Sequence, residues 1–536
     1  TWLLFSAKSD KFDFDDIPQR LEDWNNFSDE GYSYKSIEYW ARMCNSAEYD
    51  KIKQASVSEF MEKTVEDPKN YGLDNDIAVL MHKLFGNSFV CTSHVKNNWY
   101  TFKNHKWQER GAEVDLGRTL SKKLHVMYID IFRDMIYNAE AIPEEYNQKA
   151  YQEKAFRYKE VAKNLKVHSK KKNIISECKE VFFDEDFQNK LDKNPYLVGF
   201  ENGIYDIEKG EFRDGSPDDY VSMSTKINYV KINKNNPKHL ETIKNINEFM
   251  EKLFPDEKLR QYMWEHAASS VIGRNTTQKF NIYFADGCNG KSMFVKLMNS
   301  ILGDYQCTLD TALLTKKRAD ANSASPAVAK LIGKRYVSMN EGSKGDKINE
   351  GIMKQFVGGD VISARGLFKD TIEFIPQFDL ILCTNNLPEF RTNDLGTWRR
   401  VRICPFESTF KYPHEKPDPK QNEFLRDDDL EFKLDEWKEI FMSMILEKAV
   451  ETKGKVTDCD KVLSATNKYK KEQDFIARYV EERIVNDDPD SVLNFRHIQD
   501  CFEEWFKREI QGTPPKPTEL KKYLEKKMGP LGKKRS

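Results

Sequence analysis

The sequence predicts an α/β fold for the middle of the chain, with an α-rich region before it and a helical region after it. Three observations predict this. Short apolar runs recur between residues 279 and 403, and most of them end in a polar residue. One run is joined by a glycine-bearing turn to a segment whose apolar residues fall at helical spacing. On both sides of this region, apolar residues fall mainly at helical spacing.

The composition limits the class of protein. A chain of 536 residues is long enough for three or four domains, and 12% aromatic residues exclude a largely disordered chain. The net charge of −2 means that any contact with nucleic acid must come from a local patch. The nine cysteines are scattered without a C-x-x-C pair, and no apolar run reaches membrane-spanning length. We therefore expect no structural zinc site, no disulfide framework and no membrane partner.

We expect four regions. Residues 1–70 form a linker module, because Trp2-x-x-Phe5-Ser6 recurs as Trp24-x-x-Phe27-Ser28, although chance similarity explains this repeat equally well. Residues 75–230 form an α-rich domain, residues 231–410 the α/β core, and residues 411–536 a helical domain with a winged helix as one option. The chain begins with Thr1, so we expect a fragment of a longer protein whose N-terminal part is absent.

Two short signals lie in the α-rich region. The Asn202-Gly203 pair between apolar runs predicts a β-hairpin. The run Lys170-Lys171-Lys172 is basic, and such a run more often marks a solvated surface than a contact with nucleic acid.

The central turn follows an apolar run that ends at Phe284 and precedes a helical pattern that stops at Gly303. Strand, glycine-bearing turn, Lys-Ser and helix in this order predict a phosphate-binding P-loop. An ordinary glycine-rich turn between a strand and a helix is the alternative. The residues expected to bind nucleotide are Ala285, Asp286, Gly287, Cys288, Asn289, Gly290, Lys291, Ser292 and Met293.

Lys291 is expected to contact the β- and γ-phosphates, and the Ser292 hydroxyl to bind Mg²⁺. Downstream, the predicted strand 335–339 ends in Asn340-Glu341. A carboxylate at the end of a central strand is where a base or a metal ligand is needed, so Glu341 is our candidate for catalysis and for Mg²⁺. A solvated acid at a strand end is the alternative.

Two predicted strands, 361–365 and 371–374, flank a tip that carries Phe368 and Lys369. An aromatic ring stacks on a base and a lysine pairs with a phosphate, so these two residues are our candidates for binding single-stranded DNA. A plain surface hairpin is the alternative.

A further apolar strand, 379–384, ends in Asn385, whose amide is placed to hold the attacking water or the γ-phosphate. Arg399 and Arg400 precede the last apolar strand, and a guanidinium supplied by a neighbouring protein stabilises transition-state charge. The sequence does not separate these two arginines, and Arg402 stays open as a third option.

Together these segments resemble the superfamily 3 helicases, in particular the poxvirus-type primase-helicases of large nucleocytoplasmic DNA viruses. The resemblance covers roughly residues 90–410. It rests on Gly287 to Ser292 as motif A, 337–341 as motif B, 347–365 as motif B′ and 380–388 as motif C, with 202–206 similar to the signature of the preceding domain.

The resemblance implies an AAA+ type P-loop ATPase core that uses ATP and Mg²⁺. It also implies a homo-hexameric ring that takes an arginine finger from the adjacent subunit and moves along single-stranded DNA. Viral genome replication, other replication proteins as partners and a cytoplasmic replication site in the infected host cell follow from the same resemblance. Ala285 and Asn340 depart from the family pattern, where many members carry a glycine and a second acid.

Two rival functions remain open at this stage. One is a ring ATPase that acts as a DNA packaging or remodelling motor without strand separation. The other is a loader or scaffold that binds nucleotide only for assembly. The predicted DNA-binding hairpin argues against the first, and the presence of Lys291, Glu341 and Asn385 together argues against the second.

Overall fold

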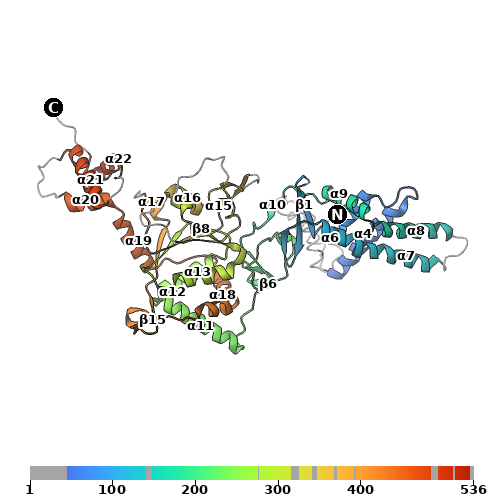
Figure 1. The fold of residues 1–536 in the computed structure, drawn as a ribbon, viewed down its shortest axis with the longest axis horizontal. Coiled ribbons are helices and arrows are strands. Elements are labelled where there is room, and N and C mark those ends of the chain that lie inside the picture. Colours follow the sequence, from blue (N-terminus) through green and yellow to red (C-terminus); the bar gives the residue numbers. More distant parts are fainter. Residues whose placement is uncertain are drawn as a thin grey trace, which may run out of the picture. The chain divides into compact units, whose positions relative to one another are not determined.

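The computed structural model describes Ala41 and residues 45–93, 95–139, 148–275, 277–315, 325–340, 347–366, 371–390, 394–484, 493–510 and 514–530. They divide into two compact units (Figure 1). The first comprises Thr1–Thr101 and Glu109–Phe187, and the second comprises Phe102–Gln108 and Gln188–Ser536.

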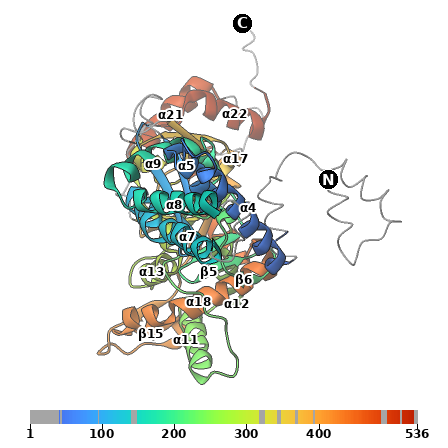
Figure 2. The same ribbon diagram turned by 90° about the vertical axis from the view of Figure 1, so that its right-hand side faces the viewer.

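The first unit is mainly helical. Its helices are α4 (Ser46–Glu66), α5 (Asp74–Phe85), α6 (Glu113–Thr119), the π-helical turn η2 (Leu120–Leu124), α7 (His125–Ala139), α8 (Gln148–Asn164) and α9 (His168–Val181). Strands β1 (Phe89–Ser93), β2 (Asn98–Lys103) and β3 (Lys106–Glu109) form a three-stranded sheet, of which residues 102–108 are grouped with the second unit. Helices α7 and α8 lie side by side in both views (Figures 1 and 2).

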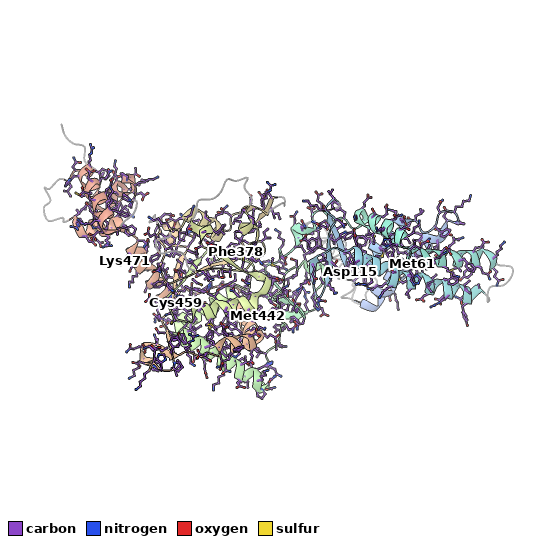
Figure 3. The ribbon with its side chains drawn as sticks, viewed as in Figure 1. Met61, Asp115, Phe378, Met442, Cys459 and Lys471 are labelled. Atoms are coloured by element: carbon purple, nitrogen blue, oxygen red, sulfur yellow. The ribbon has the colours of Figure 1, made fainter. Side chains whose placement is uncertain are left out.

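One hydrophobic cluster holds the first unit together. It joins Met61, Leu116, Tyr128 and Cys178, which come from four different helices, and Figure 3 labels Met61 in this unit. Because Met61 and Val65 are buried in it, helix α4 belongs to the packed unit. The packing therefore begins before residue 70, where we expected a linker to end.

The second unit is built on a five-stranded parallel sheet. Its strands are β7 (Phe280–Phe284), β8 (Gln306–Asp310), β9 (Tyr336–Asn340), β12 (Asp379–Thr384) and β13 (Val401–Pro405), in the spatial order β13-β7-β12-β9-β8. The four apolar strands predicted from the sequence are thus neighbours in one sheet. Figure 1 shows helices on both sides of it.

The strands alternate between two hydrophobic clusters, as expected for a sheet covered on both faces. In β7, Tyr283 faces the cluster formed with α11 (Pro237–Leu253), α12 (Glu257–Ser269), α13 (Lys291–Leu302) and α18 (Leu430–Thr452). Phe280 and Ile282 face the opposite cluster, which contains α14 (Ala312–Thr315), α15 (Pro326–Ala329), α16 (Glu350–Gly358) and α17 (Leu395–Trp398). The unit is therefore a three-layer α/β/α arrangement.

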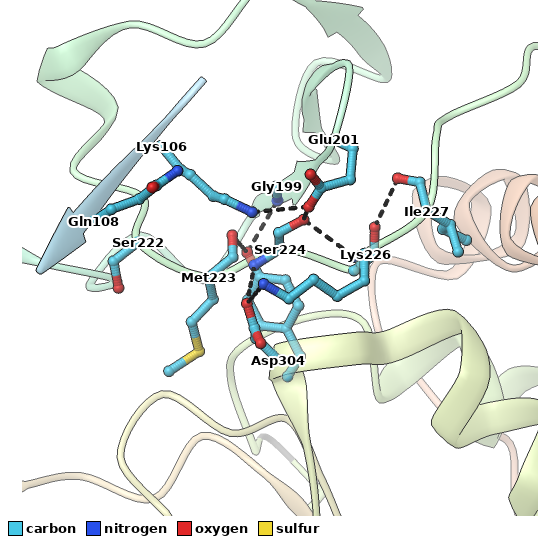
Figure 4. A network of polar contacts seen from close by, with 12 residues as sticks. Lys106, Gln108, Gly199, Glu201, Ser222, Met223, Ser224, Lys226, Ile227 and Asp304 are labelled. Atoms are coloured by element: carbon cyan, nitrogen blue, oxygen red, sulfur yellow. Dashed lines mark hydrogen bonds and ion pairs between the residues drawn. The ribbon is translucent and has the colours of Figure 1, made fainter. Parts of the chain in front are cut away.

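The predicted hairpin at Asn202-Gly203 is confirmed. Strands β4 (Leu197–Phe200) and β5 (Gly203–Asp206) pair antiparallel, and β6 (Glu211–Arg213) adds a third strand. Residue Glu201 at this turn accepts hydrogen bonds from Lys106 Nζ at 2.8 Å and from Ser224 Oγ at 2.6 Å (Figure 4). The contact with Lys106 lowers the pKa of Glu201. Lys226 and Ser224 also contact Asp304, directly after α13, so this segment is fastened to the core of the second unit.

The packing boundaries differ from those we expected at 230 and 410. Residues 188–230 belong to the second unit, so the predicted 75–230 region is divided near residue 187. Helix α18 packs against α11, α12 and α13, and α19 (Asp460–Glu472) packs against β13. Their apolar side chains, with Met442 and Cys459 labelled in Figure 3, complete the core clusters. The 411–472 segment is thus part of the core.

The last helices have a hydrophobic cluster of their own, centred on Phe502 and Trp505. They are α20 (Phe475–Arg483), α21 (Phe495–Glu509) and α22 (Pro517–Met528). Within residues 475–484, 493–510 and 514–530 the structure contains helices and no strand, so these residues provide no wing. Among the helices that the structure describes, none is both long enough and apolar enough to cross a bilayer.

A buried arginine fixes the start of strand β9. Arg335 is 3% exposed, donates to Leu197 O at 2.6 Å and to Val271 O, and lies over the Tyr305 ring with its guanidinium carbon 4.4 Å from the ring centre.

Arg335→Met is expected to lower the free energy of unfolding by about 2 kcal/mol or more, because two buried carbonyls lose their donor. The thermal unfolding midpoint measures this loss. The exposed Arg274→Met is the control, and equal midpoints for the two variants would contradict a structural role for Arg335.

Candidate active site

The turn between β7 and α13 has positive φ angles at three positions, two of which are glycines. Gly287, Cys288 and Gly290 adopt positive φ angles of 119°, 50° and 77°. A Cβ atom on Gly290 would lie 2.3 Å from Leu253 Cδ2 and 3.2 Å from Phe410 Cε2. Gly290 is therefore required both by its conformation and by the space around it. The φ angle of Ala285 is not positive, so its Cβ imposes no strain of this kind.

The chain that follows β13 lies against this turn. Phe410 N donates to Cys288 O at 2.8 Å, and the Asn289 side chain donates to Ser408 O at 3.1 Å. Asn289 Oδ1 also accepts from Gly287 N at 2.7 Å, inside the turn. The turn is thus held in shape by its own residues and by a segment more than a hundred positions later.

Strand register brings Lys291 and Asn385 together. In the parallel pair β7 and β12, Phe284 is opposite Thr384, so the two residues that follow these strands leave the sheet at the same edge. Lys291, the first residue of α13, donates to Ala285 O at 2.8 Å and to Asn385 Oδ1 at 2.5 Å. Lys291 and Asn385 are therefore in direct contact although they lie 94 positions apart in the sequence.

A cavity of about 830 Å³ opens at this edge of the sheet. Gly287 to Met293 line one side of it, and Asn340 and Asn385, which end β9 and follow β12, line another. Ser292 is exposed at the first turn of α13, where unpaired backbone N–H groups favour an anion. This volume and this lining suit a phosphate-bearing ligand.

The sequence did not reveal the third wall of the cavity. Strands β14 (Thr409–Lys411) and β15 (Glu423–Leu425) pair in parallel at the start of the region where we expected a helical domain. They bring Tyr412 and Arg426 to the cavity, and the Arg426 guanidinium lies over the Tyr412 ring at 5.3 Å. Phe432, at the start of α18, adds a ring that is 77% exposed. The alternation Phe410-x-Tyr412 was the available sequence signal.

The predicted arginines lie at the other end of the sheet. Val401 pairs with Phe280, so Arg399 and Arg400 precede the amino end of β13, whereas the glycine turn follows the carboxyl end of β7. Arg399 is exposed, and Arg400 donates to Gly396 O at 2.8 Å. Neither arginine lines the cavity of its own chain.

Arg402, the third option, is engaged elsewhere. Its side chain forms a two-pronged ion pair with Asp458, with nitrogen–oxygen distances of 2.9 and 3.0 Å. The side chain is 9% exposed, and the pair lowers the pKa of Asp458. Arg402 therefore has a structural partner, which favours Arg399 and Arg400 for any contact with another molecule.

Three candidate residues lie outside the described residues, namely Glu341, Phe368 and Lys369. Their neighbours are described. Asn340, which ends β9, pairs in register with Cys383 of β12. The strands β10 (Ile362–Arg365) and β11 (Thr371–Phe374) form the predicted antiparallel hairpin, with Arg365 opposite Thr371 next to the tip.

Two cysteines belong to the cavity wall. Cys383 lies in β12, where burial raises its pKa to about 12, so that it remains a thiol at neutral pH. Cys288, in the glycine turn, is the exposed cysteine among those in the described residues. Its thiol therefore provides a chemical probe of the cavity.

Comparisons with known proteins show which proteins this chain is similar to. The family model described as "D5 N terminal like" matches residues 78–255, and a family of unknown function (DUF5906) matches residues 284–400. A protein of Acanthamoeba polyphaga mimivirus, named as a candidate helicase, is 32% identical over 98% of this chain and 55% of its own length. A protein of African swine fever virus, named as a candidate primase, is 25% identical over 95% of this chain and 55% of its own.

The chain thus spans about half the length of the curated relatives it matches. Among solved structures, the apo C terminal region of NrS-1 is 15% identical, with a TM-score of 0.33 over 52% of this chain and 64% of that one.

Proposed function

Because the chain belongs to the family of primase-helicases from large DNA viruses, we propose that it is an ATP-driven DNA helicase that translocates on single-stranded DNA as a hexameric ring. The observation that carries this proposal is the Lys291–Asn385 contact beside a glycine turn at the carboxyl edge of a parallel sheet. Viral genome replication, at a cytoplasmic site in the infected cell and with other replication proteins, is the setting that we propose.

The strand order supports a P-loop ATPase of the AAA+ type. Strand β12, which is followed by Asn385, lies between the glycine-turn strand β7 and the strand β9, after which Glu341 comes in the sequence. An acid after β9 and an amide after β12 would therefore flank the γ-phosphate of a nucleotide held at the turn. This is the placement that hydrolysis needs, since the attacking water must be oriented beside the phosphate.

The residues present suit a Mg²⁺-bound nucleotide. The glycine turn lines the cavity, the packing of Leu253 and Phe410 leaves no room for a Cβ at Gly290, and Lys291 lines the same cavity. Among the described residues, no group of three or more His, Cys, Asp or Glu could hold a metal by itself. We propose that Ser292 and Glu341 hold Mg²⁺ together with the nucleotide's own phosphate oxygens, as is common for this ion. When bound, the ion neutralises charge on the phosphates.

The third wall suits the nucleoside part. Tyr412, Phe432 and Leu253 offer two aromatic rings and an aliphatic side chain at the cavity, and such surfaces hold a base by stacking and burial. We propose that the base rests against this wall while the phosphates lie on the glycine turn.

The arginines support a site shared between subunits. A five-residue strand spans about 16 Å, so Arg399 and Arg400 are remote from the glycine turn of their own chain. We propose that they complete the site of an adjacent subunit, which makes hydrolysis depend on ring assembly. We further propose that the tips of the β10–β11 hairpins, with Phe368 and Lys369, contact the DNA strand in the pore.

The proposal predicts that single-stranded DNA, more than duplex, stimulates ATP hydrolysis, and that particles of six chains carry the activity. Particle mass measured together with phosphate release tests both statements, and a forked substrate reports strand separation. Lys369→Ala should lose the stimulation while basal hydrolysis is largely kept. Stimulation by duplex alone, without strand separation, would instead favour a packaging or remodelling motor.

A further inference from the structure

A strongly basic segment in the first unit has no role in the proposed ATPase site. Residues 148–172, which span α8 and the start of α9, contain nine lysine and arginine residues and two glutamates. The chain as a whole is nearly neutral, with a net charge of −2. This local excess of positive charge therefore calls for a structural explanation.

The fold turns the apolar side chains of this segment inward. Helix α8 buries Ala155, Tyr158 and Val161, helix α9 buries Ile174 and Cys178, and Leu165 is buried in the turn that joins them. Several of the other positions, most of them charged, face solvent. Lys163, Lys166, Lys170 and Lys172 are consequently exposed at the corner where α8 meets α9.

A second basic segment reaches the same corner. The π-helical turn η2 carries the exposed Lys122 and Lys123, which precede these four lysines by forty to fifty residues in the chain. Ser121 beside them donates to Leu165 O at 3.5 Å and accepts from Lys171 Nζ at 3.2 Å. We call the exposed lysines of these two segments the basic corner, namely Lys122, Lys123, Lys163, Lys166, Lys170 and Lys172.

The charge of the basic corner is largely uncompensated. Within the described part of the chain, Lys163 pairs with Glu160 at 3.5 Å, and no carboxylate pairs with Lys122, Lys166, Lys170 or Lys172. Two acids of α6 and α9 have other partners. Glu113 approaches Lys179, and Glu177 accepts from Asn75. Several unpaired ammonium groups on one surface produce a local positive potential, despite the balanced composition of the whole chain.

We propose that the basic corner binds the phosphate backbone of a nucleic acid, at a site separate from the ATP cavity and from the β10–β11 hairpin. A protein partner fits this surface less well, because a protein interface needs an apolar centre. The exposed large apolar side chains next to these two segments in the chain are two single valines, Val126 and Val167. Lysines are point charges that suit successive phosphates, and release of counterions from the backbone drives such binding without base contacts.

The test uses the complete chain without nucleotide. Fluorescence anisotropy with a labelled 30-nucleotide single strand and a labelled 30-base-pair duplex is measured from about 50 to 300 mM KCl. In the variant Lys122→Gln, Lys166→Gln, Lys170→Gln, Lys172→Gln we expect weaker binding, by at least about tenfold at low salt. We also expect the slope of log affinity against log salt to fall by about three, since each phosphate contact contributes about 0.7 to 0.9.

The matched control removes the same number of charges from the same unit. Lys51, Lys63, Lys69 and Lys83, exposed on α4, on α5 and between them, are changed to Gln. Three of them have local partners, namely Glu48, Glu59 and the Phe60 ring. We expect less than a threefold change in affinity and a slope within one unit of the original.

The results distinguish between binding of the single strand, binding of the duplex and no binding at the basic corner. A larger loss on the single strand or on the duplex identifies which form binds at the basic corner, and the double variant Lys170→Gln, Lys172→Gln should show about half the slope change. An unchanged slope, or equal losses in the test and control variants, would overturn the proposal. Since ATP is absent, Lys291→Ala is expected to bind nucleic acid as the unmodified chain does. The test of the basic corner therefore stays valid even if the proposed ATPase function is wrong.

Discussion

Lys291→Ala is expected to reduce ATP turnover by at least about 100-fold while the protein stays folded. The lysine ammonium is the charged donor at the mouth of the glycine turn, and loss of one donor to developing charge typically costs two to three orders of magnitude in rate. Lys291 is only partly buried, and its side chain contributes little to the hydrophobic core. Steady-state phosphate release measures turnover, and circular dichroism checks the fold.

A second readout separates binding from hydrolysis. In the unmodified chain, ATP should protect the exposed Cys288 from alkylation, because the phosphates would cover the turn that carries it. Lys291→Ala should lose part of this protection. Lys244→Ala, on an exposed lysine of α11 that pairs with Glu248 at 3.8 Å, is the control and should retain both turnover and protection. Turnover at the original rate in Lys291→Ala would contradict the site.

The double variant Arg399→Ala, Arg400→Ala is expected to be nearly inactive alone, yet to regain activity when mixed with Lys291→Ala. An arginine finger contributes about three to five orders of magnitude to hydrolysis. In mixed rings of the proposed kind, an intact glycine turn on one subunit would meet intact arginines on its neighbour. Phosphate release from mixtures at several ratios measures this recovery.

The control for this experiment is each inactive variant mixed with itself at the same total concentration. Mixtures that stay inactive, although both variants assemble to the same mass as the unmodified chain, would show that the arginines do not complete a neighbour's site. The same conclusion would follow if the arginine variant alone kept full activity.

The local elements of the sheet could be predicted, and the packing around them could not. Strands β7, β9, β12 and β13 are short apolar runs with a polar residue at or near one end, so their existence and the edge where Asn385 emerges followed from the sequence. Their order in the sheet depends on pairing between residues far apart in the chain. Periodicity, which reports only on neighbours a few positions away, does not carry that information.

The third wall of the cavity illustrates the same limit. Strands β14 and β15 are three residues each, too short to give a periodic signal, and they become strands by pairing with each other. Residues 411–536 were predicted to be helical, but the place of helix α18 against α11 to α13 depends on which of its faces meets the core. Residues 411–429 are rich in charged residues and give no sign of a role in the site, yet Tyr412 and Arg426 within them line the cavity.

Strand β13 and its continuation join two features at opposite ends of the sheet. Arg399 and Arg400 precede the strand, and the residues that follow it are hydrogen-bonded to the backbone of the glycine turn. Because β13 is also paired along its length with β7, it is a stiff connection and not a loose tether. A displacement of the arginines by a neighbouring molecule would therefore be transmitted along β13 to the glycine turn. In the proposed ring, the shape of the glycine turn in one subunit would then depend on whether the adjacent site holds nucleotide. Such coupling would allow the subunits to hydrolyse ATP one after another.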